Sequence, residues 1–192
     1  VHVVKALFAG QPAEFSGHHY TITGHQQYPP PAQSPRPPIQ IAGGGPRLLR
    51  FASREADIIG INPVTKSNAA WAEQNIADAS AEVMDGKVAL IREAAGDRYD
   101  ALELQIVVPC VVIPDDREGT AAAIAGSLPA DDPSVDLSAG NVLSSPHVLI
   151  GNESQICDTI MERRERWDFS YYVFNDDSLD VVAPIVDRLA GK

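Results

Sequence analysis

The stretch PPIQIAGGGPR, residues 37–47, decides the fold of this chain, because a short apolar strand runs into three glycines and a proline. Glycine permits close approach of the backbone and a positive φ, and Pro46 suits the first position of a helix, where no N–H partner is needed. A helix N-terminus offers free N–H groups and a partial positive charge, so the stretch predicts an anion site. The plainer alternative is a tight turn between strand and helix that binds nothing. The dinucleotide fingerprint G-x-G-x-x-G is not matched, because Leu48 stands at its third glycine position.

The composition is that of an ordinary globular protein, and we expect a single domain over residues 1–192. Hydrophobic residues make up 44% of the chain, and the formal net charge is −11. This charge argues against a nucleic acid or an acidic membrane surface as partner and favours a small molecule. No apolar run approaches the ~18 residues that a membrane helix needs, and no leader pattern is evident, so we expect a cytoplasmic protein. Cys110 and Cys157 match neither a disulfide framework nor a metal spacing, and we expect two buried thiols.

From residue 39 onward, predicted strands alternate with predicted helices. The apolar runs predict strands over residues 39–42, 57–62, 102–113 and 169–174. The helical patterns cover residues 46–56, 80–95, 115–128, a helix capped by Asn152 and Gln155, and residues 179–190. On the first of these helices we expect four residues to face inward: Leu48, Leu49, Phe51 and Ala52. Before this region, the chain predicts a short helix over residues 1–8, a hairpin over 15–24 and an extended proline-rich linker over 29–38.

The alternation predicts an α/β fold of four parallel βα units. Eight units would close a barrel of typically about 250 residues, which is more than this chain supplies. The predicted architecture is therefore half of a TIM barrel, with apolar interior faces on strands such as residues 58–61 and 107–112. Such faces and edges recruit other strands, so we expect either a homodimer or an N-terminal half that fills this role.

Five motifs, in order along nearly the whole chain, resemble the bacterial luciferase-like family, in its deazaflavin-dependent branch that is common in actinobacteria. They are Phe15–Tyr20, Pro37–Arg47, Ala52–Asp57, Pro146–Gly151 and Ala183–Val186. The resemblance implies that the four predicted strands are strands five to eight of the luciferase-like barrel, without strands one to four.

The resemblance also implies a cofactor and a reaction. In such enzymes the loop after strand five receives the phosphate of the cofactor, which makes Gly43, Gly44, Gly45 and Arg47 candidate cofactor-binding residues. The cofactor is expected to be the deazaflavin coenzyme F420, with FMN as the alternative. The implied reaction is hydride transfer between the deazaflavin and a small organic substrate. The ring is held largely by the first four strands, so the chain alone is expected to be inactive.

Three other residues, Asn62, Phe174 and Asn175, end predicted strands on the face where TIM barrels assemble active sites, and we list them as candidate substrate-binding residues. Arg50 and Arg54 follow Arg47 at helical spacing, and we expect these two to be solvated surface residues.

The remaining chemistry-bearing residues give no candidate catalytic group. His18 and His19 are adjacent and cannot form one metal site alone, so no metal is expected. His147 is expected to pack or to cap a turn. No nucleophile with an attendant base is evident, so the catalytic residues stay unknown.

Two other classes stay open. One is an FMN-dependent monooxygenase on the same barrel, and the other is a non-catalytic truncated paralogue that binds a phosphate compound or only itself. If the glycine loop is an anion site, we expect valine at Gly44 to weaken cofactor binding without unfolding the protein.

Overall fold

The computed structural model describes residues 1–64, 77–128 and 136–191. The chain divides into two compact units, residues 1–39 and residues 40–192, and each is described by itself.

The first unit is a short helix followed by a hairpin. Helix α1 spans His2–Phe8, and strands β1 (Ala13–Ser16) and β2 (Thr21–His25) pair antiparallel. The turn closes where the amide of Gly17 donates to the carbonyl of Tyr20 at 3.0 Å, and the rings of Phe15 and Tyr20 lie 5.2 Å apart. The predicted hairpin is confirmed, and the proline-rich residues after it form neither helix nor strand.

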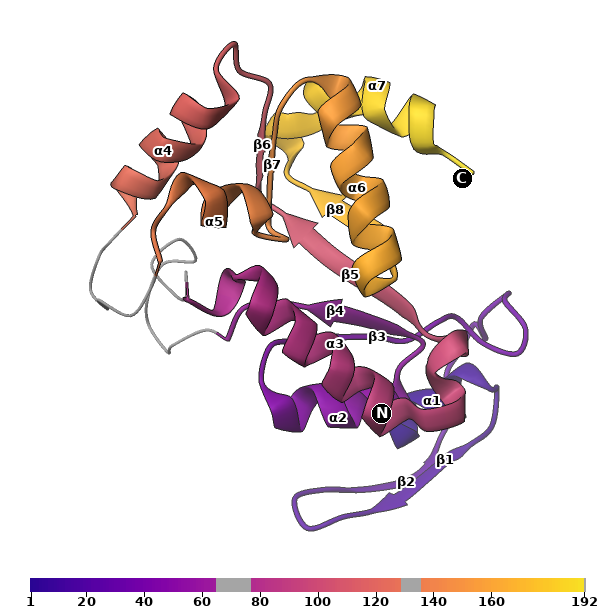
Figure 1. The fold of residues 1–192 in the computed structure, drawn as a ribbon. Coiled ribbons are helices and arrows are strands. Elements are labelled where there is room, and N and C mark those ends of the chain that lie inside the picture. The colour runs from indigo at the N-terminus through magenta and orange to yellow at the C-terminus, as the bar shows by residue number, and fades with distance from the viewer. Residues whose placement is uncertain (65–76, 129–135, 192) are drawn as a thin grey trace. The chain divides into compact units, whose positions relative to one another are not determined.

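The second unit is built on a sheet of four parallel strands, as predicted (Figure 1). The strands lie in the order β3 (Gln40–Gly43), β4 (Ile58–Ile61), β5 (Glu103–Val108) and β8 (Phe169–Phe174). Ile41 pairs with Ile59, and Ile59 pairs with Leu104, so side chains of like character lie side by side on one face. Every adjacent pair in this sheet is parallel, which is the pattern of consecutive βα units.

The prediction of one strand over residues 102–113 is wrong, because that run is divided at Pro109. Strand β5 ends at Val108, and β6 (Cys110–Val112) pairs in parallel with β7 (Val148–Ile150), which the sequence reading left out. Proline has no N–H to donate to a ladder, so Pro109 marks the point at which the chain leaves one sheet and enters another.

Apart from the short α5, for which no bounds were predicted, the helices begin and end close to their predicted bounds. They are α2 (Pro46–Glu55), α3 (Ala81–Ala95), α4 (Arg117–Ser127), α5 (Ala139–Ser144), α6 (Glu153–Trp167) and α7 (Leu179–Leu189). Short 3-10 turns cover Ala77–Ala79, Gly96–Ala101 and Asp176–Ser178. The predicted capping box is present: the Asn152 side chain accepts from the amide of Gln155, and the Gln155 side chain accepts from the amide of Asn152.

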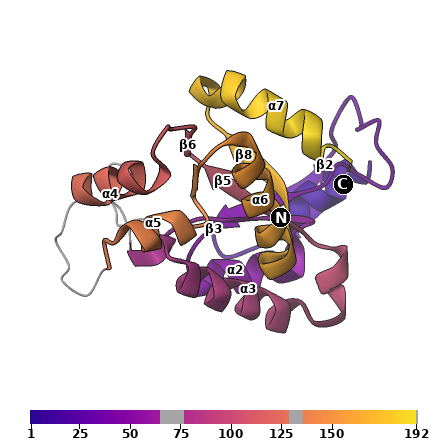
Figure 2. The ribbon, with the colours of Figure 1, turned by 45° about the horizontal axis from the view of Figure 1, so that its top comes forward.

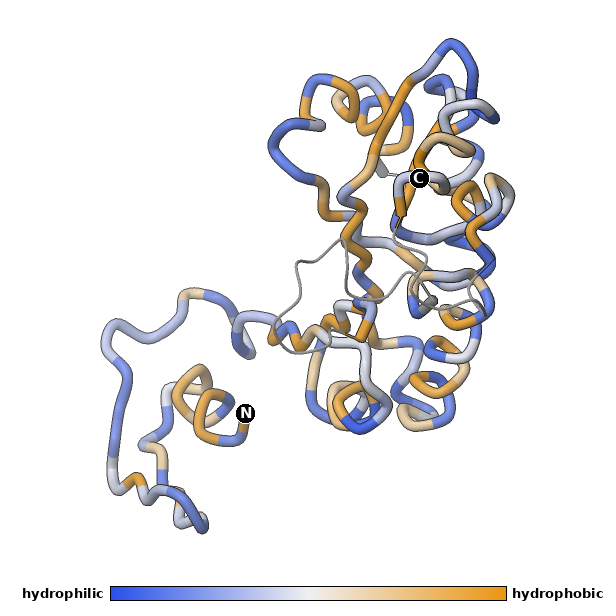
Figure 3. Tube along the Cα trace, turned by 90° about the vertical axis from the view of Figure 1, so that its left-hand side faces the viewer, coloured by the Kyte–Doolittle hydropathy of each residue, from blue (hydrophilic) through white to orange (hydrophobic). Residues whose placement is uncertain are grey.

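The core lies between the sheet and the helices α2, α3 and α6, which run along the same side of the sheet (Figures 1 and 2). The strand segments of this unit are mainly hydrophobic, whereas the outer turns are hydrophilic (Figure 3). The largest fully buried residues include Leu49, Ile59, Met84, Ile106 and Ile156. They bring α2, β4, α3, β5 and α6 into a single cluster, so each helix buries its apolar stripe against the sheet.

Two inward predictions on α2 are wrong. Leu48 is 40% exposed and Phe51 is 37% exposed, whereas Leu49, Ala52 and Ser53 are buried. A helix of this length covers the sheet with one stripe only, and Leu48 and Phe51 lie outside that stripe.

The opposite face of the sheet is less apolar than predicted. Gln105 is 2% exposed, and its Oε1 accepts from Nε2 of Gln40 at 2.9 Å. The bridge passes over Gly60, where a Cβ would overlap Oε1 of Gln105. Gly60 is therefore required for a polar link between β3 and β5, in the middle of a strand that reads as purely apolar.

Candidate functional site: two adjoining pockets at the carboxyl ends of the strands

The predicted glycine loop connects the end of β3 to the start of α2. Gly45 is the N-cap residue, with φ −78° and ψ 145°, and Pro46 occupies the first helical position, as predicted. The first N–H groups of a helix have no intrahelical acceptor, and they carry the positive end of the helix dipole. The N-terminus of α2 is therefore able to bind an anion.

The three glycines of this loop have different surroundings. A Cβ at Gly43 would overlap the side chain of Leu48, and a Cβ at Gly44 would lie 2.7 Å from the amide nitrogen of Val64 and 2.8 Å from the carbonyl carbon of Pro63. A Cβ at Gly45 would meet nothing within 4 Å. Gly44 thus lets two loops pack together, whereas a Cβ at Gly45 would project into open space.

These surroundings correct two expectations about the loop. None of the three glycines adopts a positive φ, and only Gly43 and Gly44 are needed for close approach. Valine at Gly44 would collide with the backbone of residues 62–64, so this substitution would disturb the fold itself.

The loop borders a wide hollow of about 940 Å³, called here the glycine-loop hollow. Arg47 and Arg54 line it from α2, together with the exposed side chains of Leu48 and Phe51. Arg50 is not among its lining residues. Two residues that line the hollow were not predicted as site residues. Arg54 was expected to be solvated only, and Phe51 was expected in the core. Their spacing from Arg47 on one helix face was the available signal.

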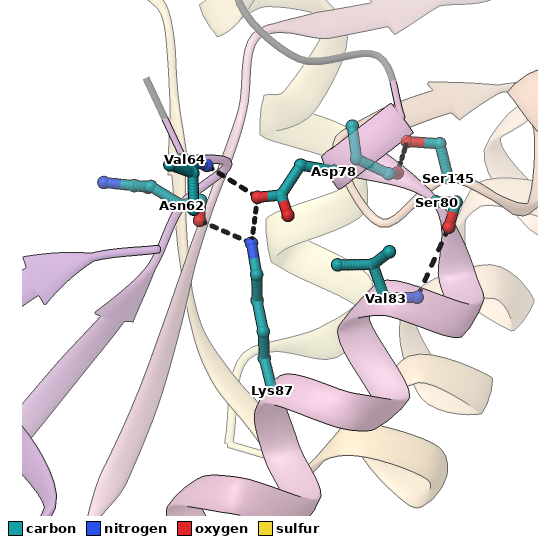
Figure 4. Close-up of polar contacts among 8 residues, drawn as sticks. Asn62, Val64, Asp78, Ser80, Val83, Lys87 and Ser145 are labelled. Carbon is teal, nitrogen blue, oxygen red and sulfur yellow. Dashed lines mark hydrogen bonds and ion pairs between the residues drawn. The ribbon is translucent and has the colours of Figure 1, made fainter. Parts of the chain in front are cut away.

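The far wall of the glycine-loop hollow is the segment after β4, residues 62–64, which is held by a buried lysine (Figure 4). The ammonium of Lys87, a residue 7% exposed, donates to the carbonyl of Asn62 at 2.9 Å and to Oδ2 of Asp78 at 2.5 Å. The same carboxylate accepts from the amide of Val64 at 2.6 Å. This network ties the segment to α3 and so fixes the wall on which Gly44 packs.

A second, smaller cavity of about 180 Å³ lies beside the hollow and is called here the apolar pocket. Pro63 lines both cavities, so the two share part of a wall. The wall of the apolar pocket includes side chains from α4, α5 and the β5–β6 junction, among them Ile124, Val142 and Cys110. Cys157 is buried as predicted, whereas Cys110 is only partly buried and borders this pocket. Burial raises the pKa of the Cys110 thiol.

His147 lies at the inner wall of the apolar pocket and is 2% exposed, so the expectation that it packs is confirmed. Its Nδ1 lies 2.9 Å from the carbonyl oxygen of Val107, and because a carbonyl oxygen only accepts, Nδ1 carries the proton. Burial, together with the nearby cations of Lys87 and Arg163, lowers the pKa of His147 to about 4, against the opposing effects of the hydrogen bond to Val107 and of the Asp78 carboxylate. The imidazole is therefore neutral at pH 7.

The turn that carries His147 is held by a buried arginine. Arg163 of α6 is 4% exposed, and its guanidinium donates to the carbonyls of Ser145 and Val148, both at 2.6 Å, and of Pro146 at 3.0 Å. Burial lowers the pKa of Arg163 to about 10, which leaves it charged at neutral pH.

The structure brings some of the other candidates together and separates the rest. Asn62 lines the glycine-loop hollow together with Gly43, Gly44, Gly45 and Arg47. Phe174 packs against the core between α6 and α7, and Asn175 is exposed, with its side-chain amide 3.5 Å from the carbonyl of Pro109.

Two absences hold for residues 1–64, 77–128 and 136–191, the parts of the chain that the structure describes. No group of three or more His, Cys, Asp or Glu residues there is arranged to hold a metal ion. No helix within those parts is long and apolar enough to cross a membrane.

Successive βα units with a loop hollow at the carboxyl ends of the strands define the chain as part of a barrel-type α/β enzyme fold. The sequence profile of the luciferase-like monooxygenase family matches residues 1–166, and the chain therefore belongs to that family. A comparison with curated protein sequences gave no significant match.

Solved structures support the same fold. An F420-dependent secondary alcohol dehydrogenase in complex with an F420–acetone adduct aligns with a TM-score of 0.62 and 14% identity, over 95% of this chain and 58% of its own. The coenzyme F420-dependent tetrahydromethanopterin reductase of Methanopyrus kandleri aligns with a TM-score of 0.65 and 14% identity, over 97% and 60%. A monooxygenase from Streptomyces bottropensis aligns with a TM-score of 0.57 and 17% identity, over 90% and 50%. The chain thus spans between half and three fifths of the length of these three structures and forms a partial barrel.

Proposed function

We propose that this chain forms the phosphate-binding half of a luciferase-like oxidoreductase that uses a deazaflavin, coenzyme F420. The observation that carries the proposal is the glycine-loop hollow, in which the N-terminus of α2 and the side chains of Arg47 and Arg54 border one open space. Helix N–H groups and guanidinium groups are the donors that bind phosphate in proteins. The protein as a whole has an excess of acidic residues, so this basic hollow is a local exception.

The residues of the hollow fit the phosphate end of such a cofactor. Gly45 leaves room for an anion close to the helix, Arg47 lies next to the helix start, and Arg54 lies two turns further along the same face. The exposed ring of Phe51 offers an apolar surface to the part of the ligand that follows the phosphate. When bound, the cofactor supplies the chemistry of hydride transfer to or from a small organic substrate.

FMN is the alternative cofactor, because the solved structures of this fold include both an F420-dependent dehydrogenase and a riboflavin lyase with modified FMN. A phosphate-binding hollow serves either cofactor. A protein that binds a phosphate compound without catalysing a reaction would carry the same hollow.

The experiment compares ligands that differ only in the phosphate-bearing part. F420 is titrated against the same deazaflavin without its phosphate-bearing tail, and FMN against riboflavin, with the fluorescence of each ligand as the readout. We expect each phosphate-bearing ligand to bind more tightly than its partner, and F420 more tightly than FMN.

Two variants of α2 complete the test. Arg47→Ala removes a lining guanidinium and is expected to lower the affinity for the phosphate-bearing ligands about tenfold, which corresponds to about 1.4 kcal/mol. Arg50→Ala, on the same helix but outside the hollow, serves as the matched control and is expected to leave the affinity for these ligands unchanged. Equal binding of FMN and riboflavin, and of both deazaflavins, would overturn the proposal.

A further inference from the structure

A cavity next to the glycine-loop hollow has a chemical character opposite to that of the hollow. The apolar pocket lies under α4 and α5, with Ile124, Leu128, Val142 and Val148 in its wall. Pro63, which it shares with the hollow, places it beside the proposed cofactor site.

The polar side chains in the wall of the apolar pocket are engaged with the protein. Oγ of Ser80 accepts from the amide of Val83, and Oγ of Ser145 donates to the carbonyl of Ala79 at 2.8 Å. The side-chain amide of Asn141 donates to the carbonyl of Asp136 at 2.6 Å. The remaining two, Asp136 and His147, bond to Ser138 and to Val107.

This wall selects against charge. A ligand entering the pocket finds hydrocarbon surface, a neutral imidazole and, at an exposed position, the carboxylate of Asp136. An anion would lose its hydration without gaining a counter-ion, and transfer of an unpaired charge into apolar surroundings is strongly unfavourable. An apolar group loses only unfavourable contact with water.

The volume of the pocket sets the size of the group. An engineered apolar cavity of about 150 Å³ in another protein binds benzene. The cavity here, of about 180 Å³, is slightly larger.

We propose that the apolar pocket binds a neutral hydrocarbon group, a ring or short chain about the size of benzene or toluene, and that this group is the hydrophobic part of the substrate. The binding of such a group stands on the geometry of the pocket alone. Its identity as the substrate rests on the proposed function, because only that function places a cofactor in the adjoining glycine-loop hollow.

Methyl NMR on the 192-residue chain tests the binding. We expect added toluene to shift the methyl signals of Ile124, Leu128, Val142 and Val148, while those of Leu49 and Ile59, buried in the main core, stay in place. Benzoate, of the same shape but charged, is expected to shift the pocket methyls at least tenfold more weakly at equal concentration. The proposal would be overturned if toluene left the pocket methyl signals in place, or if benzoate shifted them as strongly as toluene does.

Two wall variants and a control separate binding in the pocket from general effects. Ala79→Leu adds volume to the wall and is expected to lower toluene affinity at least tenfold, whereas Ala122→Leu, at an exposed position of α4, leaves it unchanged. Ile124→Ala enlarges the pocket and is expected to shift the preference from toluene toward propylbenzene. The two wall variants test the proposal independently. An unchanged ligand preference in whichever of them folds would overturn it.

The same titrations distinguish the failure of this proposal from the failure of the proposed function. Toluene binding without phosphate-dependent binding of F420 or FMN removes the proposed function and with it the substrate role of the pocket. Phosphate-dependent cofactor binding without toluene shifts removes the pocket proposal and leaves the proposed function in place.

Discussion

The glycine-loop hollow and the apolar pocket share Pro63 but are built from different chemical groups. The hollow is lined by backbone, by two arginines and by partly exposed apolar side chains, and it is wide and open. The apolar pocket is about five times smaller by volume, about 180 against about 940 Å³. Its polar side chains are hydrogen-bonded within the protein. One loop can therefore separate a region that attracts an anion from one that excludes it, and the following predictions test this contrast.

The largest effect is expected at the turn behind the apolar pocket. Arg163→Ala leaves three carbonyl oxygens without their donor and opens a void, so we expect it to lower the free energy of unfolding by about 4 kcal/mol. Urea denaturation measures the change. Arg164→Ala, on an exposed position of the same helix, is expected to cost less than about 1 kcal/mol. Equal losses in the two variants would show that the buried contacts of Arg163 do not hold the turn.

His147, in the wall of the apolar pocket, is expected to make the free energy of unfolding depend on pH. The pKa of His147 is about 4 in the folded chain and 6.5 as its ordinary value, so between these values the unfolded state binds more protons. Stability is therefore complete above pH 6.5 and is lost as the pH falls toward 4, by up to about 3 kcal/mol from this residue. The charges near it are those of Lys87, Arg163 and Asp78.

Denaturation at several pH values checks this prediction against His147→Gln. The variant keeps a side-chain N–H but does not titrate, so its stability is expected to fall less steeply between pH 6.5 and 4. Parallel curves for the two proteins would contradict the assignment of the pH dependence to His147.

A smaller effect separates two neighbouring glycines of the hollow. Gly44→Ala places a Cβ against the backbone of residues 62–64 and is expected to lower the free energy of unfolding by about 2 kcal/mol. Gly45→Ala places one in open space, at a φ and ψ that alanine adopts readily. The lower entropy of the unfolded chain offsets the weaker N-cap preference of alanine, so the free energy of unfolding is expected to change by less than about 0.5 kcal/mol. Thermal denaturation of both variants makes the comparison, and similar melting temperatures would refute it.

The smallest effect concerns Arg54, which is exposed at the rim of the hollow. Arg54→Ala is expected to weaken FMN binding about threefold at low salt, and this difference is expected to shrink as added salt screens the charge. Arg50→Ala again serves as the control, because that residue does not line the hollow. If Arg50→Ala weakened binding as much as Arg54→Ala, the effect would come from the charge of the whole helix and not from the hollow.

The sequence by itself determined the order of the four strands of the main sheet and of the helices that follow them, the start of α2 at Pro46 and the capping box of α6. Each of these depends on contacts within a few residues, such as the mutual hydrogen bonds of Asn152 and Gln155, so the local pattern contains the information. The period of the apolar residues also sufficed for the parallel sheet, because each strand and helix must bury one face.

Only the tertiary structure decided which residues make the two cavities. Gly44 is confined because residues 62–64 lie against it, and Phe51 and Arg54 border the hollow because the stripe of α2 that packs on the sheet is narrower than the pattern suggested. Lys87 reaches Asn62 across 25 positions of sequence, and Arg163 reaches Ser145 across 18. Contacts of this kind depend on the register of strands and the packing of helices, which bring distant residues together and which no local pattern in the chain specifies.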